Sequence, residues 1–426
     1  MCPNLLGCPG VTDAATEEHR EKIDRVFREE YGRVVSVLIR LVGDFELAED
    51  LVGEAFEKAL EEWPRAGIPE RPGAWLTTVA RRRGLDRLRH AKMAREKHRA
   101  IESLDAQMRD EVREETVGYA DERLRLIFTC CHPGLAQEAQ VALTLREVCG
   151  LTTEEIARAF LRKPSTVAQR IVRAKSKIRD ARIPYEVPDR DELPGRFDRV
   201  LRVIYLVFNE GHLASQGSDL LRPDLTAEAI RLARLLADLM PEPEGLGLLA
   251  LLLLQDSRRD ARTQENGYLI PLEQQDRALW DRTAIAEGAA LVQRALRSRR
   301  FGTYTLQAAI AAVHAEAPSA GATDWAEIVG LYDALLSIEP SPVIELNRAV
   351  ALAMRDGPDA GIALIEPLLA PDLLGGYHLA HAAKADLERR AGRTGPARAA
   401  YETALALARQ DSERRFLTAR LAELGD

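Results

Sequence analysis

The 426-residue sequence is poor in cysteine and contains no long apolar run. Its five cysteines are odd in number and sparse for this length, which argues against a disulfide framework and favours reduced thiols. The longest apolar run, residues 246–254, is far shorter than the roughly 20 residues that span a bilayer. The start, Met1-Cys2-Pro3-Asn4, lacks the basic segment of a secretory signal. We therefore expect a soluble cytoplasmic protein.

Aromatic residues are also scarce, at 5% of the sequence, and runs of Val, Ile and Thr are few. Ala, Leu, Arg and Glu instead recur in long helical patterns, which predict an all-α chain. The length exceeds what one hydrophobic core usually organises, so several domains are expected. Pro- and Gly-containing breaks and shifts in charge divide the chain into a head at residues 20–99, an acidic flexible linker at 100–121, a second helical unit at 122–183 and a C-terminal helical domain at 184–426.

The charge is unevenly distributed, although the net charge of −8 by itself argues against a nucleic-acid ligand. Residues 71–99 hold ten Arg or Lys against two acidic residues, and residues 161–182 hold eight against one. The rest of the chain is strongly acidic. Two basic islands in an acidic protein predict two separate surfaces that contact nucleic acid.

A helix-turn-helix is predicted near residue 150. Thr152 and Glu155 form a capping box, and Leu151 with Ile156 a hydrophobic staple, so one helix begins here and ends near residue 160. Pro164 suits the first turn of the next helix. One face of that helix is apolar and is expected to be buried: Val167, Ile171, Ala174 and Ile178. The opposite face carries groups that read base edges or neutralise phosphates: Ser165, Thr166, Gln169, Arg170, Arg173 and Lys177. A helical hairpin with a solvated basic face is the alternative.

A basic helix is predicted in the head, with an apolar stripe formed by Leu76, Ala80, Gly84 and Leu88. The cations Arg81, Arg82, Arg87, Arg89 and Lys92 cover its other faces. Asp86 can pair with Arg82, Arg83 or Arg89 at helical spacing. At the entry to the helix lie Arg71 and Trp75, whose ring either stacks on an unpaired base or belongs to the core.

An acidic helix precedes the basic one. Its apolar side is formed by Leu47, Leu51, Val52, Ala55, Phe56, Ala59 and Leu60, and its other faces carry Glu46, Glu49, Asp50, Glu54 and Glu57. Such an acidic face is either solvated or a surface for docking on another protein. Next to a basic helix, it would suit a protein that brings DNA to a larger machine.

These features, in this order, resemble the extracytoplasmic-function sigma factors of bacterial RNA polymerase, which belong to the sigma-70 family. Residues 43–56 are similar to regions 2.1 and 2.2, which dock on the clamp helices of the beta-prime subunit. Residues 74–89 are similar to regions 2.3 and 2.4, which melt and read the −10 element. Residues 151–179 are similar to region 4, the −35 reader. Two positions depart from the family pattern: Gly53 replaces a usual Gln and Arg82 a usual Asn.

The resemblance implies specific site residues, with the polymerase core (beta-prime clamp and beta flap) and promoter DNA as partners. For polymerase binding they are Asp44, Glu49, Asp50, Leu51 and Phe56. For the −10 element they are Arg71, Trp75, Arg81, Arg82, Asp86, Arg87 and Arg89. For the −35 element they are Ser165, Thr166, Gln169, Arg170, Arg173 and Lys177. A stand-alone helix-turn-helix regulator with a helical sensor domain is the alternative function.

The C-terminal half resembles one subgroup of these factors. Residues 126–133, residues 205–211 and a repeat region after residue 320 are similar to the group with a fused tetratricopeptide-like domain, often called the ECF42 group. Residues 383–405 follow the tetratricopeptide pattern of paired helices, and such pairs stack to form a surface for a partner. The resemblance implies a small DGPF-type (YCII-related) protein as that partner.

No catalytic site, metal site or cofactor is expected. Glu210 and His212 could be read as a catalytic pair, and Cys130-Cys131-His132 with Cys149 as a metal site. Adjacent cysteines on a helix point to different faces, however, and no metal-binding spacing supports zinc. Gly211 is expected to end a helix with a positive φ angle.

Overall fold

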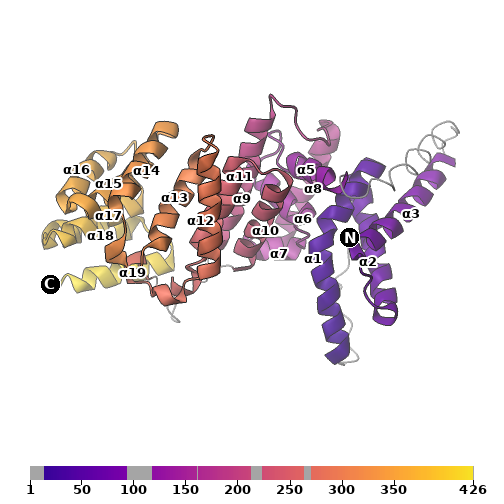
Figure 1. The fold of residues 1–426 in the computed structure, drawn as a ribbon, viewed down its shortest axis with the longest axis horizontal. Helices are drawn as coiled ribbons and strands as arrows, with labels where there is room; N and C mark the ends of the chain where they lie inside the picture. The colour runs from indigo at the N-terminus through magenta and orange to yellow at the C-terminus, as the bar shows by residue number, and fades with distance from the viewer. Residues whose placement is uncertain (1–13, 94–117, 161, 213–222, 263–269, 426) are drawn as a thin grey trace. The chain divides into compact units, whose positions relative to one another are not determined.

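The computed structural model describes residues 14–93, 118–160, 162–212, 223–262 and 270–425, and every element within these ranges is helical (Figure 1). The prediction of an all-α chain is therefore confirmed. The chain divides into two compact units, residues 1–206 and 207–426. Most of the acidic linker expected at residues 100–121 lies outside the described residues. None of the described helices is both long enough and apolar enough to cross a membrane.

The head is formed by α1 (Ala14–Val42), α2 (Phe45–Ala66) and α3 (Pro72–Met93). Gly43, with a φ angle of 70°, ends α1, and the Asp44 carboxylate caps α2 by accepting a hydrogen bond of 2.9 Å from the Leu47 amide. Five of the seven residues on the predicted apolar side of the acidic helix are buried, with Leu51 and Ala55 fully inaccessible to solvent, whereas Leu47 and Leu60 are partly exposed.

The helix-turn-helix follows the predicted boundaries. Its unit contains α5 (Gly118–Cys130), α6 (Gln137–Glu147), α7 (Thr153–Ala159) and α8 (Pro164–Asp180). The Glu155 amide donates to the Thr152 hydroxyl at 3.1 Å, and the Thr152 amide donates to the Glu155 carboxylate at 2.8 Å, which confirms the capping box. The four residues of the predicted inner stripe of α8 are all buried.

Helix α1 is shared between the head and the helix-turn-helix unit, since it packs against α2 and α3 on one side and against α5 and α6 on the other (Figure 1). Gly32 allows this close approach, because a Cβ atom there would lie 2.4 Å from the Val148 carbonyl oxygen. Tyr31, 4% exposed, fills the neighbouring space beside Gly150. The head and the helix-turn-helix unit therefore form one continuous core.

The remaining helices follow one another along the chain, and from α10 onward each packs mainly against the next one or two helices in sequence. They are α9 (Leu193–His212), α10 (Pro223–Leu239), α11 (Pro243–Asp256), α12 (Arg282–Arg297), α13 (Thr303–Glu316), α14 (Trp325–Ile338), α15 (Pro342–Asp356), α16 (Pro358–Leu368), α17 (His378–Arg390), α18 (Thr394–Leu407) and α19 (Asp411–Glu423). Short 3-10 turns occur at Arg259–Ala261, Leu272–Gln274, Arg277–Leu279 and Ala320–Ala322.

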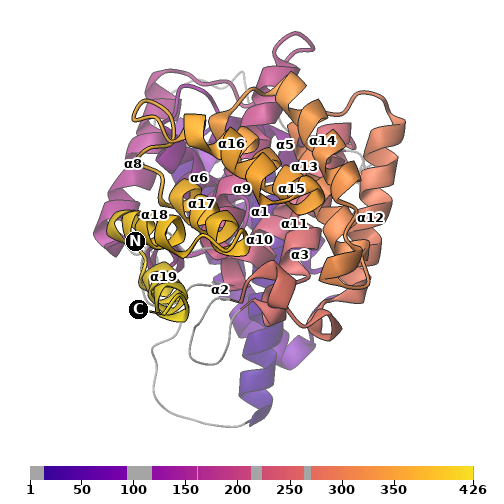
Figure 2. The same ribbon diagram turned by 90° about the vertical axis from the view of Figure 1, so that its left-hand side faces the viewer.

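The last helices pack in pairs. Helices α15 and α16 pack together around Ala349 and Ile365, and α17 and α18 run side by side around Ala385 and Tyr401 (Figure 2). All four of these side chains are less than 2% exposed. A short turn joins the two helices of each pair.

The prediction for Gly211 was wrong. Helix α9 continues through this residue to His212, and Gly211 is not among the described residues with positive φ. A Cβ atom at Gly211 would lie 2.7 Å from the Thr226 amide nitrogen at the start of α10. Glycine is therefore required here for close helix packing and not for a turn.

Candidate nucleic-acid and protein interfaces

The outer face of α8 presents most of the predicted −35 residues. Ser165, Thr166, Gln169, Arg173 and Lys177 are exposed on it. Arg170 differs, since its side chain is only 27% exposed and its guanidinium forms an ion pair with Glu138 of α6. Hydroxyl, amide and guanidinium groups are therefore brought to one face of a helix, which is the arrangement that reads base edges in a major groove.

The cations of α3 are partly neutralised by the acidic helix beside it. Glu54 of α2 lies 2.6 Å from Arg83 and also forms an ion pair with Arg87. Asp86 pairs with Arg89 at 3.4 Å, one of the three predicted partners. Arg82 is exposed, and Arg81 is half-buried. The sequence pattern placed Glu54 on an acidic face but did not indicate that this face lies against α3.

Trp75 lies at the entry to α3 and is half-buried. Its ring meets the ring of Trp63, which is 1% exposed, in an edge-on contact with the centroids 5.3 Å apart. Arg71 is exposed at the same end of the helix. The structure thus places one part of the Trp75 ring on the core and leaves another part accessible, and the stacking of this ring on a base stays a prediction.

The residues predicted to bind polymerase occupy different environments on α2. Asp50 is exposed, and Asp44 caps the helix. Leu51 is fully buried, and Phe56, 3% exposed, packs against Phe27 with the ring centroids 4.7 Å apart. Leu51 and Phe56 therefore hold α2 in the core of the head and present no surface. Glu49 faces the helix-turn-helix unit.

A buried cluster joins Glu49 to two residues that the sequence analysis missed. The Lys175 ammonium of α8 lies 2.6 Å from Glu49 and 2.9 Å from Glu147 of α6. Lys175 is 8% exposed and Glu147 is fully buried. Arg146 lies 3.5 Å from the other Glu49 oxygen. We call Lys175, Glu49 and Glu147 the interface triad.

The two carboxylates of the interface triad differ in their protonation. Burial raises the pKa of Glu147 to about 8, and the nearby Glu49 charge adds to this effect against the opposing attraction of Lys175. Burial also raises the pKa of Glu49, but Lys175 and Arg146 outweigh it, so that the pKa of Glu49 lies below its ordinary value. Because two adjacent carboxylates share one ammonium, the fully buried Glu147 is the one that holds a proton at neutral pH.

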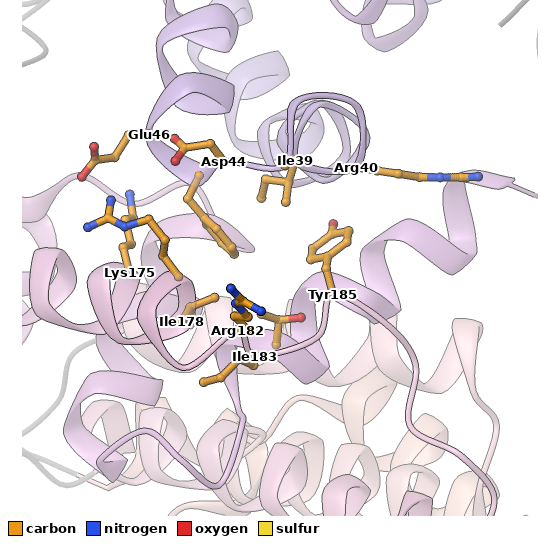
Figure 3. A pocket seen from close by; sticks show the side chains of 13 residues that line it. Ile39, Arg40, Asp44, Glu46, Lys175, Ile178, Arg182, Ile183 and Tyr185 are labelled. Carbon is orange, nitrogen blue, oxygen red and sulfur yellow. The ribbon is translucent and has the colours of Figure 1, made fainter. Parts of the chain in front are cut away.

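A cavity of about 390 Å³ opens beside the interface triad (Figure 3). It lies between the turn that joins α1 to α2 and the end of α8, and its lining includes Asp44, Phe45, Ile178 and Tyr185. Tyr185 donates a hydrogen bond of 3.0 Å to the Ser36 carbonyl of α1, and its ring meets Phe45 edge-on. The cavity is therefore a gap at the junction between the head and the helix-turn-helix unit.

Family comparisons match the two parts of the chain that carry these surfaces. Residues 26–93 match the model of sigma-70 region 2, and residues 125–178 match that of sigma-70 region 4. The first part of the chain therefore carries sigma-70 regions 2 and 4, in that order along the sequence. Sigma-70 proteins are transcription initiation factors and not enzymes. In the chain described here, region 2 is the head with α2 and α3, and region 4 is the unit that ends with α8.

Two named relatives are extracytoplasmic-function sigma factors, and each match covers less than two fifths of the chain. The probable factor SigI of Mycobacterium tuberculosis is 32% identical over 39% of the chain and 58% of its own length. SigK of Mycobacterium ulcerans is 27% identical over 35% of the chain and 75% of its own length. The chain thus spans a little over half the length of SigI and three quarters of the length of SigK.

A relative of full length also exists. The uncharacterized protein R00370 of Rhizobium meliloti is 44% identical over 92% of the chain and 93% of its own length, so the chain shares the whole architecture with it. Within the second half, residues 196–296 match a family of unknown function, DUF6596. The fusion of sigma-70 regions to this C-terminal half is therefore not peculiar to one sequence.

Proposed function

We propose that the chain is an extracytoplasmic-function sigma factor that directs RNA polymerase to specific promoters. The observation that carries the proposal is the outer face of α8, where Gln169 and Arg173 stand exposed on the second helix of a capped helix-turn-helix. Region 4 includes this helix and region 2 precedes it, which is the order found in a sigma factor. In this role α8 reads the −35 element through the major groove.

Region 2 supplies the other two contacts. The exposed cations of α3, with Arg82 foremost, bind the −10 region, and the accessible part of Trp75 offers a stacking surface for an unpaired base. Helix α2 docks on the beta-prime clamp through Asp50 and Glu49, while Leu51 and Phe56 hold the helix in place. Region 4 has the beta flap as its partner.

The charge of the chain suits an initiation factor that works only with polymerase. A net charge of −8 repels phosphates, so the free protein is expected to bind DNA poorly at physiological salt. Promoter affinity then arises when the core enzyme supplies further contacts. A stand-alone regulator, in contrast, must bind its operator without help.

The C-terminal helices have an interaction role in this proposal. The paired helices α15 to α18 support a tetratricopeptide-like array of the ECF42 type, and arrays of this kind bind partner proteins. A small DGPF-type (YCII-related) protein is the candidate partner. The chain would meet polymerase and this partner in the cytoplasm.

Co-elution with core polymerase, followed by a DNA shift assay with and without core, tests the proposed function. We expect the full chain to co-elute with core and to shift promoter fragments only in its presence. A chain that shifts specific DNA alone and ignores core would be a stand-alone regulator and would refute the proposal.

A further inference from the structure

We propose that the C-terminal half binds a small phosphate-bearing ligand at three arginines, Arg258, Arg262 and Arg277, which we call the arginine cluster. The inference goes beyond the proposed function and does not rest on it, because that function assigns this half to partner proteins and gives these side chains no role. It adds a ligand site within the second compact unit, residues 207–426.

The arginine cluster is brought together by two short 3-10 turns that pack against each other. Arg258 and Arg262 flank the turn Arg259–Ala261, which follows α11, and Arg277 begins the turn Arg277–Leu279. Each of the three arginine side chains is half-buried. The fold thus gathers three cationic groups that are packed among other atoms and can still be reached from solvent.

The positive charge of the arginine cluster is not neutralised by the protein. Within the described ranges no member of the cluster forms an ion pair, and Asp256, the carboxylate that attracts Arg262, is itself bound by Arg259 at 2.9 Å. Burial lowers the pKa of Arg258 from 12.5 to about 10, and the Arg277 charge adds to this effect. Burial likewise lowers the pKa of Arg262 to about 10, with a further contribution from Arg258. The charges therefore repel one another in a poorly solvated place, and an anion bound there would relieve both costs.

The hydrogen bonds of the arginine cluster fix its side chains and leave donors over. Nη1 of Arg262 donates to the His212 carbonyl at 2.7 Å, and Nη1 of Arg277 donates to the carbonyls of His314 and Ala317 at 2.7 and 2.8 Å. A guanidinium carries five N–H donors, and the bonds that these two arginines make to other described residues use one nitrogen of each. The carbonyls hold the side chains in place but cancel no charge, so the other donors can serve an anion.

The indole of Trp280 gives a second, independent indication of an external acceptor. The Arg277 guanidinium lies 4.4 Å from the centroid of the Trp280 ring. This ring is 2% exposed, and its Nε1–H, which can only donate, meets no acceptor among the residues that the structure describes. Because buried donors in folded proteins are nearly always paired, an orphaned donor in contact with Arg277 points to an oxygen supplied by a ligand.

Phosphate suits the arginine cluster better than a carboxylate does. A phosphate monoester carries close to two negative charges at neutral pH and three strong acceptor oxygens, whereas a carboxylate carries one charge and two oxygens. The planar fork of an arginine donates two parallel bonds to phosphate oxygens, and three such forks offer more positive charge than one carboxylate can neutralise. The site therefore fits a phosphate group, either as the free ion or at the end of a small organic molecule.

Calorimetric titration of the full chain at constant ionic strength tests the proposal, with inorganic phosphate, glycerol 3-phosphate and acetate as probes. We expect saturable binding of the two phosphates, one per chain, and weaker binding of acetate. Arg258→Met should weaken phosphate binding by about 10- to 150-fold, the usual effect of losing a hydrogen bond to a charged group. Arg294→Met, at an exposed position of α12, is the matched control and should bind as wild type. Tighter binding of glycerol 3-phosphate identifies an organic phosphate as the ligand, and tighter binding of inorganic phosphate identifies the free ion.

Denaturant unfolding of the same variants distinguishes a binding site from a purely structural role. Because the Arg258 charge is uncompensated, Arg258→Met should keep or raise the unfolding midpoint in phosphate-free buffer. Phosphate stabilises many proteins unspecifically, so the informative quantity is the difference between variants: it should stabilise wild type and Arg294→Met more than Arg258→Met. Arg262→Met provides the same comparison if Arg258→Met does not fold.

Three results would overturn the proposal. The first is that neither phosphate binds the folded wild-type chain. The second is that the Arg258→Met and Arg262→Met variants bind phosphate as tightly as wild type while losing stability in phosphate-free buffer, which would make these arginines structural. The third is binding of an acidic peptide in place of both phosphates, which would assign the arginine cluster to a protein partner.

Discussion

Replacement of Arg173 by alanine is the substitution that should affect −35 recognition most clearly. Arg173 is exposed on the outer face of α8, and no ion pair engages it within the described ranges. A guanidinium that contacts a base edge contributes about 1–3 kcal/mol of discrimination, so Arg173→Ala should lower output from the cognate promoter by about 5- to 150-fold.

Arg170 gives a graded comparison on the same helix. Its pair with Glu138 is a surface ion pair, which is worth under about 1 kcal/mol, but it holds the guanidinium toward α6. Arg170→Ala should therefore reduce promoter output less than Arg173→Ala. Arg179, exposed near the end of α8 and outside the predicted reading face, provides the matched control.

Run-off transcription on templates with single substitutions in the −35 element is the appropriate assay. If Arg173 reads a base, the Arg173→Ala variant should lose its preference at one position and keep it elsewhere. A uniform loss at all templates, with a smaller dependence on salt, would indicate a phosphate contact instead. Equal output from the Arg173→Ala and Arg179→Ala variants would refute the assignment of this face.

Three further predictions concern stability and can be measured by denaturant unfolding of the full chain, with helical circular dichroism as the signal. Thr152→Ala removes the cap of α7 and should cost about 1 kcal/mol, whereas Thr152→Ser should cost little; a cost equal for both variants would contradict the role of the hydroxyl. Gly32→Ala forces a methyl group against the Val148 carbonyl and should cost about 1–3 kcal/mol, and an unchanged midpoint would show that α1 is not held there. The pKa of Glu147 is raised to about 8 in the fold, against an ordinary value of 4.5. The stability that the protonated Glu147 gives to the folded state is therefore fully present below pH 4.5 and is lost as the pH rises toward 8 and beyond. Stability should thus fall by roughly 2 kcal/mol between pH 6 and pH 8, and Glu147→Gln should remove this slope; a slope that persists in that variant would assign the proton to another group.

Local rules predicted the helix-turn-helix well. The capping box at Thr152 and Glu155 depends only on residues three apart, and the inner stripe of α8 depends only on helical spacing. Both are properties of a single segment, so no knowledge of its neighbours was needed. The boundaries of α7 and α8 followed from them.

Features that depend on contacts between segments could not be predicted in this way. The Glu54 pairs with Arg83 and Arg87 join α2 to α3, and the role of Gly211 appears only when α10 lies against α9. Lys175 is an instructive exception. It follows Ala174 within the apolar stripe between Ile171 and Ile178, and a lysine at such a position signals a buried ionic partner even before the partner is known.

Reconstituted transcription tests the central claim most directly. Core RNA polymerase and the purified full chain are incubated with fragments of the source genome, and the transcripts are sequenced from their 5′ ends. The proposed function predicts discrete start sites that share −10 and −35 sequences and that are absent with core alone. The same background of transcripts with and without the chain would contradict it.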